Sequence, residues 1–221
     1  MLRGKAVAGV RTMELDQWAE AFIREHGGEP AFKGYGGFPG TLCTSVNEEC
    51  VHGIPGARAL REGDIVSLDC GVRFEGLVTD ACITVPIGRV SEDAVHVMEV
   101  AQAALERAVS VLKAGIHVGD VSHAIEEVVR AGSCKVIKPL TGHGLGESVH
   151  HYPDIPNHGR RGTGPVFPAG TVVAIEPIVS LEDDDVRQLS DGWTLVTAKG
   201  SLCSHSEYTL LVTEQGCDII A

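Results

Sequence analysis

The 221-residue sequence has few aromatic residues, 5% of the total, and no apolar run that reaches the roughly 18 residues of a membrane-spanning helix. It also has no glycosylation acceptor, no phosphate-binding P-loop and no Gly-x-Ser-x-Gly nucleophile elbow. Its first residues lead into no apolar run long enough for a secretory signal. We therefore expect a cytoplasmic protein without a membrane partner.

Basic residues are also scarce, because 18 lysines and arginines face 30 aspartates and glutamates, a formal net charge of -12. Such a surface repels phosphate backbones, and no local basic patch offsets it, so we expect no nucleic-acid partner. The seven cysteines are an odd number, and no pair has the two-residue gap of a zinc knuckle or a redox motif. We expect reduced thiols, and the acidic balance fits a site built from carboxylates.

Apolar spacing and capping residues predict three helices, over residues 14–26, 91 to about 112 and about 118–130. Runs of β-branched residues between clusters of Gly, Pro and Asp predict strands over residues 65–70, 77–85, 171–179 and 208–213. This mixture indicates the α+β class. The length is that of one domain over residues 1–221.

The sequence contains a weak internal repeat with an offset of 106 residues. It aligns Gly9 with Gly115, Val10 with Ile116, Glu14 with Asp120, Leu15 with Val121, Glu20 with Glu126, Phe22 with Val128, Ile23 with Val129 and Arg24 with Arg130. The repeat predicts two related halves, about 1–90 and 91–221. Only eight residues precede Gly9, whereas in the second half the repeated helix follows the one that begins near Ser91. We therefore expect that a first N-terminal helix is missing and that an apolar groove is exposed in its place.

Two aspartates lie where a predicted hairpin should carry apolar side chains. If the turn is centred between residues 74 and 75, Asp69 on one strand directly faces Asp80 on the other. Carboxylates so placed repel each other and are costly to bury unless a cation lies between them. A solvated pair at a sheet edge is the structural alternative.

Glu176 and Glu207 each add an acidic residue to an apolar strand. Singly, such a residue is more often edge protection or a salt-bridge partner than a functional group. Four acids at strand positions in one chain weaken these separate explanations. The sequence therefore favours a shared carboxylate site.

Three histidines complete this candidate site. His143 lies among glycines that let the backbone approach closely, His150 follows seven residues later, and His52 lies in a turn-like segment. The glycine spacing is not that of a dinucleotide-binding loop. One imidazole with four carboxylates suits Mn, Fe(II), Co or Zn, and such a set can hold two ions roughly 3.5–4 Å apart.

The sequence resembles type I methionine aminopeptidases, which have the pita-bread metallohydrolase fold. The matching motifs occur in the family's order, at residues 47–55, 63–69, 79–80, 141–146, 174–177, 191–194 and 207–209. The resemblance implies two pseudo-symmetric halves with a central antiparallel sheet backed by helices. It also implies a dinuclear aminopeptidase that removes N-terminal methionine from proteins and peptides with a small second residue.

The resemblance assigns roles to individual residues. The implied ligands of the two divalent ions (Co, Mn, Fe(II) or Zn) are Asp69, Asp80, His143, Glu176 and Glu207, with Asp80 and Glu207 bridging. The implied catalytic residues are His52, His150 and Glu176. The implied contacts to substrate are His52, His150, Tyr35, Phe38, Cys43 and Trp193. The partners would be N-terminal peptides of nascent proteins, at the ribosome or free, and the protein would be a monomer.

The sequence departs from the family pattern at three positions. His205 stands where a Gln is usual, Tyr208 where a His is usual, and Val149 where an aromatic residue is usual. The first two change the surroundings of ligand Glu207 and hence the metal preference. Val149 should loosen one side of the methionine pocket.

Two other functions remain open at this point. One is an X-Pro aminopeptidase or dipeptidase of the same fold, against which the motifs at 52–55 and 191–193 argue. The other is a catalytically inactive binding module, against which the retained ligands and histidines argue. Stoichiometric metal binding separates the module from the enzymes.

Overall fold

A computed structural model describes residues 1–221 of the chain. Its three α-helices, α1 (Thr12–Glu25), α2 (Glu92–Val111) and α3 (Val118–Ala131), begin and end within two residues of the predicted segments. Two short 3-10 helices, η1 (Leu2–Gly4) and η2 (Tyr35–Gly37), were not predicted. No helix combines the length and the apolar character that a membrane span requires.

The strands form four small sheets. The strands of the first half are β1 (Glu29–Pro30), β2 (Leu42–Val46), β3 (Glu49–Val51), β4 (Ile65–Phe74) and β5 (Leu77–Pro86). The others are β6 (Lys135–Val136), β7 (Thr141–Gly144), β8 (His151–Pro156), β9 (Val172–Ile175), β10 (Ile178–Ser180), β11 (Val186–Gln188), β12 (Leu195–Thr197), β13 (Cys203–His205), β14 (Tyr208–Val212) and β15 (Cys217–Ile219). The sheet pairings are antiparallel, as the fold class predicts.

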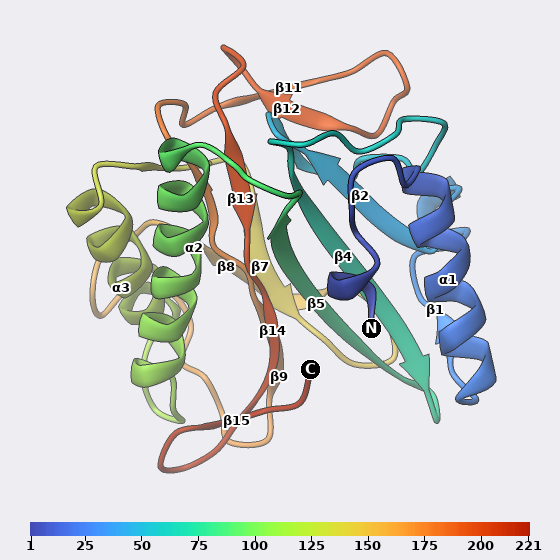
Figure 1. The fold of residues 1–221 in the computed structure, drawn as a ribbon. Coiled ribbons are helices and arrows are strands. Elements are labelled where there is room, and N and C mark those ends of the chain that lie inside the picture. Colours follow the sequence, from blue (N-terminus) through green and yellow to red (C-terminus); the bar gives the residue numbers. More distant parts are fainter.

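The largest sheets meet in the middle of the molecule. One contains β1, β2, β4 and β5, and the other has the order β15-β14-β9-β7-β8. A bridge between Cys82 on β5 and Glu207 joins them, and Thr209 Oγ1 both accepts from Asp80 N and donates to Asp80 O at 2.7 Å. Figure 1 shows this central sheet between α1 on one side and α2 and α3 on the other. The α+β pita-bread fold is therefore confirmed.

The internal repeat is visible in the hydrogen bonds. Gly9 and Gly115 both have positive φ (91° and 87°) and donate from N–H to the carbonyls of Leu60 and Phe167. Two residues after each glycine, the backbone N–H of the residue that precedes the helix donates to an acidic side chain of the first turn. Arg11 N donates to Glu14 in α1, and His117 N donates to Asp120 in α3, both at 2.9 Å. The offset also relates β1 to β6, and α1 to α3 at both ends.

The predicted apolar groove is present. Residues before α1 form only the short η1, and a hollow of about 450 Å³ lies between α1 and the face of β4 and β5. Its apolar walls include Phe22, Leu68, Val72, Phe74 and Ile83. In the second half, α2 covers the sheet and contributes to a core of 22 buried residues. The first half has a smaller cluster of 10 beside the groove.

The predicted register of the β4–β5 hairpin is wrong by two positions. Glu75 and Gly76 form a two-residue loop with φ values of 49° and 86°, the left-handed pair typical of tight hairpins. Asp69 is therefore opposite Cys82, and Asp80 is opposite Gly71. Because a two-residue shift preserves the alternation of side chains, both aspartates still lie on one face, as diagonal neighbours.

The predicted strand over 171–179 is also wrong, because the structure divides it at Glu176 and Pro177. The chain leaves one sheet as β9, which pairs with β14, and enters another as β10, which pairs with β13. Pro177 has no N–H for a ladder, which suits this crossing. Glu207 lies between β13 and β14, where the chain passes between the same two sheets. Each glutamate therefore lies where the chain passes from one sheet to the other.

Candidate metal centre

The four predicted carboxylates come together at the join between the two large sheets. The exposed fractions of these residues are 8% for Asp69, 4% for Asp80, 8% for Glu176 and 2% for Glu207. No lysine or arginine forms an ion pair with any of them. Oδ1 of Asp69 and Oδ1 of Asp80 are buried without a hydrogen-bond partner. Buried carboxylates of this kind need a cation.

The electrostatics of the cluster agree with this requirement. Burial raises the pKa of Asp69 to about 7. Burial raises the pKa of Asp80 well above its usual value, and the charges of Glu207 and Asp69 raise it further. The pKa values of Glu176 and Glu207 are also raised well above their usual range by burial and by neighbouring carboxylates. In the metal-free protein these groups would retain protons, which a bound ion would displace.

His143 on β7 presents one nitrogen to the carboxylates. Its Nδ1 is 3.0 Å from the carbonyl of Gly144, which as the acceptor places the proton on Nδ1 and leaves the Nε2 lone pair free. Nε2 lies 3.3 Å from Oε1 of Glu176. Burial lowers the pKa of His143 to about 4, so its ring is neutral at pH 7. A Cβ at Gly142 would collide with the carbonyl of Ala174, so this glycine allows β7 to approach β9.

These residues fit a metal ion. One ligand atom from each of Asp80, His143 and Glu207 lies within 4.8 Å of the others, and all three residues are buried. The neighbouring Asp69 and Glu176 add oxygen donors. Carboxylate oxygens with an imidazole are ligands of borderline divalent ions such as Mn, Fe(II), Co and Zn.

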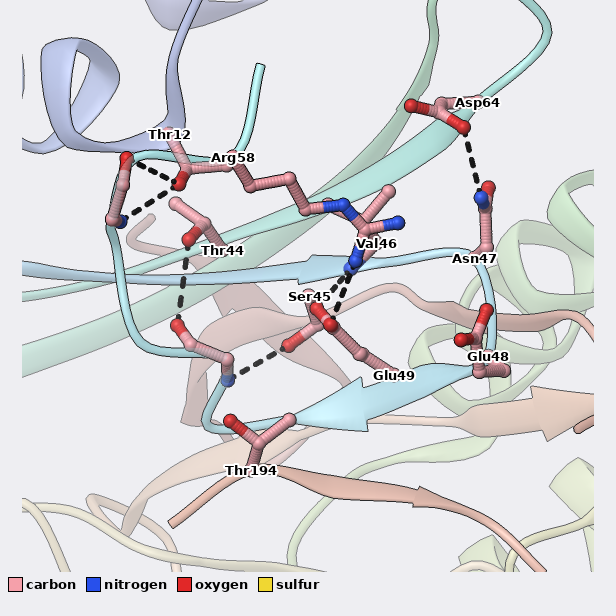
Figure 2. Close-up of polar contacts among 12 residues, drawn as sticks. Thr12, Thr44, Ser45, Val46, Asn47, Glu48, Glu49, Arg58, Asp64 and Thr194 are labelled. Carbon is pink, nitrogen blue, oxygen red and sulfur yellow. Dashed lines mark hydrogen bonds and ion pairs between the residues drawn. The ribbon is translucent and has the colours of Figure 1, made fainter. Parts of the chain in front are cut away.

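A hydrogen-bonded loop between β3 and β4 holds His52 at the cavity. His52 has a φ of 59°, in the left-handed region that non-glycine residues rarely adopt. The next residue, Gly53, donates to Ser45 Oγ at 3.2 Å and accepts from Thr44 N at 2.8 Å, and Thr194 Oγ1 donates to His52 O at 3.5 Å. Figure 2 shows Thr44, Ser45 and Thr194 around this loop, with dashed lines from the side chains of Thr44 and Ser45 to the loop backbone.

Charged side chains close the same loop. Glu49 accepts from Val46 N and from Arg58 Nη1, both at 2.8 Å, and Asn47 Nδ2 donates to Asp64 at 2.9 Å (Figure 2). Residues 47–55, where the sequence motif lies, therefore form a fixed support for His52. Burial lowers the pKa of His52, so this ring is neutral at pH 7.

His150 lies opposite, above His143. Its Nδ1 is 3.0 Å from the hydroxyl of Tyr35, and its ring centroid is 4.3 Å from that of His143. The odd offset of seven residues did not put the two histidines on opposite sides, because the chain leaves β7 after Gly144 and His150 lies in the following loop. Tyr35 thus holds His150 from η2, a contact that the sequence alone did not predict.

One cavity of about 120 Å³ unites these groups. All eleven predicted metal-ligating, catalytic and substrate-contacting residues line it: Tyr35, Phe38, Cys43, His52, Asp69, Asp80, His143, His150, Glu176, Trp193 and Glu207. Its apolar wall includes Phe38 and Trp193, whose rings meet edge to face at 5.2 Å. Sequence reasoning missed Phe32 and Val51 in this lining, because no local pattern distinguishes them from core residues.

Comparisons with known proteins agree with this architecture. The model of metallopeptidase family M24 matches residues 1–214, and the chain belongs to this family. It is 43% identical over 212 residues to methionine aminopeptidase 1 of Bacillus subtilis, covering 96% of this chain and 86% of that protein. It is 41% identical over 220 residues to the methionine aminopeptidase of Clostridium perfringens, covering all of this chain and 88% of that protein.

Solved structures separate two branches of this fold. The crystal structure of methionine aminopeptidase from Thermotoga maritima has a TM-score of 0.97 and 42% identity, covering 99% of this chain and 88% of that one. The X-Pro aminopeptidase of the same organism has a TM-score of 0.76 and 23% identity, covering 99% of this chain and 54% of that one. The second likeness shows the shared fold alone.

Proposed function

We propose that this chain is a metal-dependent aminopeptidase that removes N-terminal methionine from proteins and peptides with a small second residue. The observation that carries the proposal is the cavity, in which a buried carboxylate and histidine cluster adjoins an apolar wall. The similarity to methionine aminopeptidases over 96% or more of this chain supports the same substrate.

The proposed site holds two divalent ions. Asp69, Asp80, His143, Glu176 and Glu207 would bind them, with Asp80 and Glu207 shared between the two ions. When bound, such ions supply a nucleophilic water of lowered pKa near neutral pH and polarise the substrate carbonyl. Co, Mn, Fe(II) and Zn all match the donor set.

The protein's own groups would then orient and stabilise the reacting peptide. When Tyr35 donates to Nδ1 of His150, the proton of that imidazole is on Nε2, from which it can be donated to the developing oxyanion. His52 would donate to the peptide beyond the first residue. Glu176 would carry the proton from the attacking water to the leaving amine.

The apolar wall would hold the methionine side chain. Phe38, Cys43 and Trp193 line it, and Val149 adds a small apolar side chain to the same cavity. Methionine is flexible and unbranched, so it adapts to an irregular apolar space. We propose nascent chains in the cytoplasm as the substrates, at the ribosome or free, and a monomeric enzyme.

The first experiment measures release of free methionine from the peptide Met-Ala-Ser with added Mn(II) or Co(II), and with a chelator. The peptide Ala-Pro-Ala is the matched control. Chelator-sensitive cleavage of the first peptide alone supports the proposal. Cleavage of the proline peptide alone would favour the X-Pro branch, and metal binding without cleavage of either would favour a binding module.

A further inference from the structure

His205 is the one polar residue of the cavity that neither the proposed ligand set nor the proposed substrate contacts use. It stands at the end of β13, two residues before Glu207. Its side chain lines the cavity although it is only 3% exposed. A buried imidazole at this place requires a partner.

The backbone fixes the direction of this side chain. His205 N donates to Thr84 Oγ1 at 3.0 Å, and Thr84 Oγ1 donates to His205 O at 2.8 Å. Ile178 on β10 pairs with His205 on the other side. The ring is therefore held between β5 and β10 and points at the carboxylates rather than at solvent.

Neither nitrogen of the ring has a hydrogen-bond partner. Nε2 lies 3.7 Å from Oε2 of Glu176 and 3.6 Å from Oε2 of Glu207, which is too long for a hydrogen bond. A buried polar group without a hydrogen-bond partner destabilises the folded state. The arrangement is costly unless something lies between these three atoms.

A shared cation explains the spacing. Donor atoms that lie about 2.0–2.2 Å from a common ion, in tetrahedral or octahedral geometry, lie about 3.0–3.5 Å from one another. The distances of 3.6 and 3.7 Å from Nε2 are close to this range. Glu176 also has an imidazole on each side, because Nε2 of His143 faces Oε1 and Nε2 of His205 faces Oε2.

We infer that His205 Nε2 is a second nitrogen ligand of the metal centre, on the ion that Glu176 and Glu207 share. The donor set then contains two imidazoles and four carboxylates instead of one imidazole and four carboxylates. A further nitrogen favours Fe(II), Co and Zn over Mn and Mg. This inference rests on one part of the proposed function, metal binding by the carboxylate cluster, and does not depend on the peptide substrate.

The test counts imidazole ligands by X-ray absorption at the cobalt edge. Wild type, His205→Gln and the control His123→Gln, a histidine of α3 outside the cavity, are loaded with Co(II). We expect two imidazoles per chain in wild type and in the control, and one in His205→Gln. Calorimetry should show at least a roughly tenfold loss of Co(II) affinity in His205→Gln, and a smaller loss for Mn(II).

Each other result has a defined meaning. An unchanged imidazole count in His205→Gln would overturn the assignment, and with weaker affinity it would make His205 a positioning residue that hydrogen-bonds to the ligands. If His205→Gln does not fold, His205→Asn serves in its place, with near-ultraviolet circular dichroism as the check. Cobalt binding to wild type without peptide cleavage would overturn the proposed function alone, and absence of cobalt binding would overturn both.

Discussion

The first half of the chain carries one helix on its sheet, whereas the second half carries two. α1 and α3 begin with the same hydrogen bonds, but α2 has no counterpart among the residues before α1. The surface that α2 covers in the second half corresponds to an open apolar groove in the first. Burial of apolar surface is the main stabilising contribution to folding, so the halves should differ in stability.

The two halves are more alike at the site than at the helices. The first half contributes Asp69 and Asp80 from adjacent strands, and the second contributes Glu176 and Glu207 from adjacent strand crossings. The Cys82–Glu207 bridge brings the two pairs together. The comparison shows that the site depends on the join between the sheets, and that the groove lies on the opposite face of β4 and β5. Four experiments can break or sharpen this comparison.

The largest effect is expected from removing, in either half, the carboxylate that we propose is shared between the two ions. Asp80→Asn and Glu207→Gln should each lower kcat/KM by about 10³-fold or more, because several kcal/mol of transition-state stabilisation is lost. The measurement is methionine release from Met-Ala-Ser together with metal content. Asp184→Asn, on an exposed turn, is the control and should leave both unchanged. Substantial activity in one of the two variants would mean that the halves do not contribute equally.

The next effect separates the two histidines that we propose contact the substrate. His150→Ala should lower kcat by about 10²–10³-fold with metal retained, as expected for loss of an oxyanion donor. His52→Ala, in the first half, should cost about tenfold or less, the value of an ordinary hydrogen bond. Steady-state kinetics and metal analysis measure both. Loss of metal from His150→Ala would show that a ligand had been taken for a substrate contact.

A smaller effect is expected from truncating one apolar side chain in each half. Leu210 lies three residues after Glu207 and is fully buried in the core that contains α2, while Ile83 lies three residues after Asp80 and lines the groove. Leu210→Ala should cost about 2–5 kcal/mol of unfolding free energy. Ile83→Ala should cost about 1 kcal/mol, because less apolar surface is lost. Urea unfolding of the metal-free variants measures both, and equal losses would contradict the difference between the halves.

The sequence-based predictions are most accurate for features that depend on residues close together in the sequence. Helices α1, α2 and α3 depend on local spacing and caps such as Ser91, whose Oγ accepts from Ala94 N, and the sequence predicts them well. The groove was predicted because the repeat compares distant segments. The prediction that Asp69 and Asp80 lie on one face of the hairpin is correct although the predicted turn is wrong. A two-residue shift of the strand register leaves each side chain on the same face of the sheet.

Non-local features were not predictable in the same way. The division of the strand at Glu176 depends on which strands pair with β9 and β10, and no local pattern encodes that pairing. Phe32 reaches the cavity by packing on Gly71, where a Cβ would meet its ring. His205 was visible only as a departure from a family pattern, and its neighbours Glu176 and Glu207 emerge from the fold.

The smallest effect is a pH dependence of the metal-free protein, which should originate in the carboxylates that the two halves contribute to the site. Between about pH 6.5 and 8, the unfolded chain has already released its carboxyl protons. The folded metal-free protein still binds protons at the cluster, because the pKa of Asp69 is raised to about 7 and burial also raises the pKa values of Asp80, Glu176 and Glu207. Stability of the metal-free form must therefore fall as pH rises through this window.

The histidines oppose this trend only near its lower end, because the pKa values of His143 and His205 are lowered to about 4 and about 3 while the unfolded reference is about 6.5, so neither state binds their protons in the upper part of the window. Bound metal replaces the protons, so the increase in Tm from added Mn(II) over chelator should grow with pH. The slope is at most about 1.4 kcal/mol per pH unit for each proton lost. Asp69→Asn should flatten this slope in the lower part of the window, because a pKa of about 7 leaves the Asp69 proton partly bound there in the folded state. A Tm increase that is independent of pH, or a slope in Asp69→Asn equal to that of wild type, would show that Asp69 binds no proton in this window.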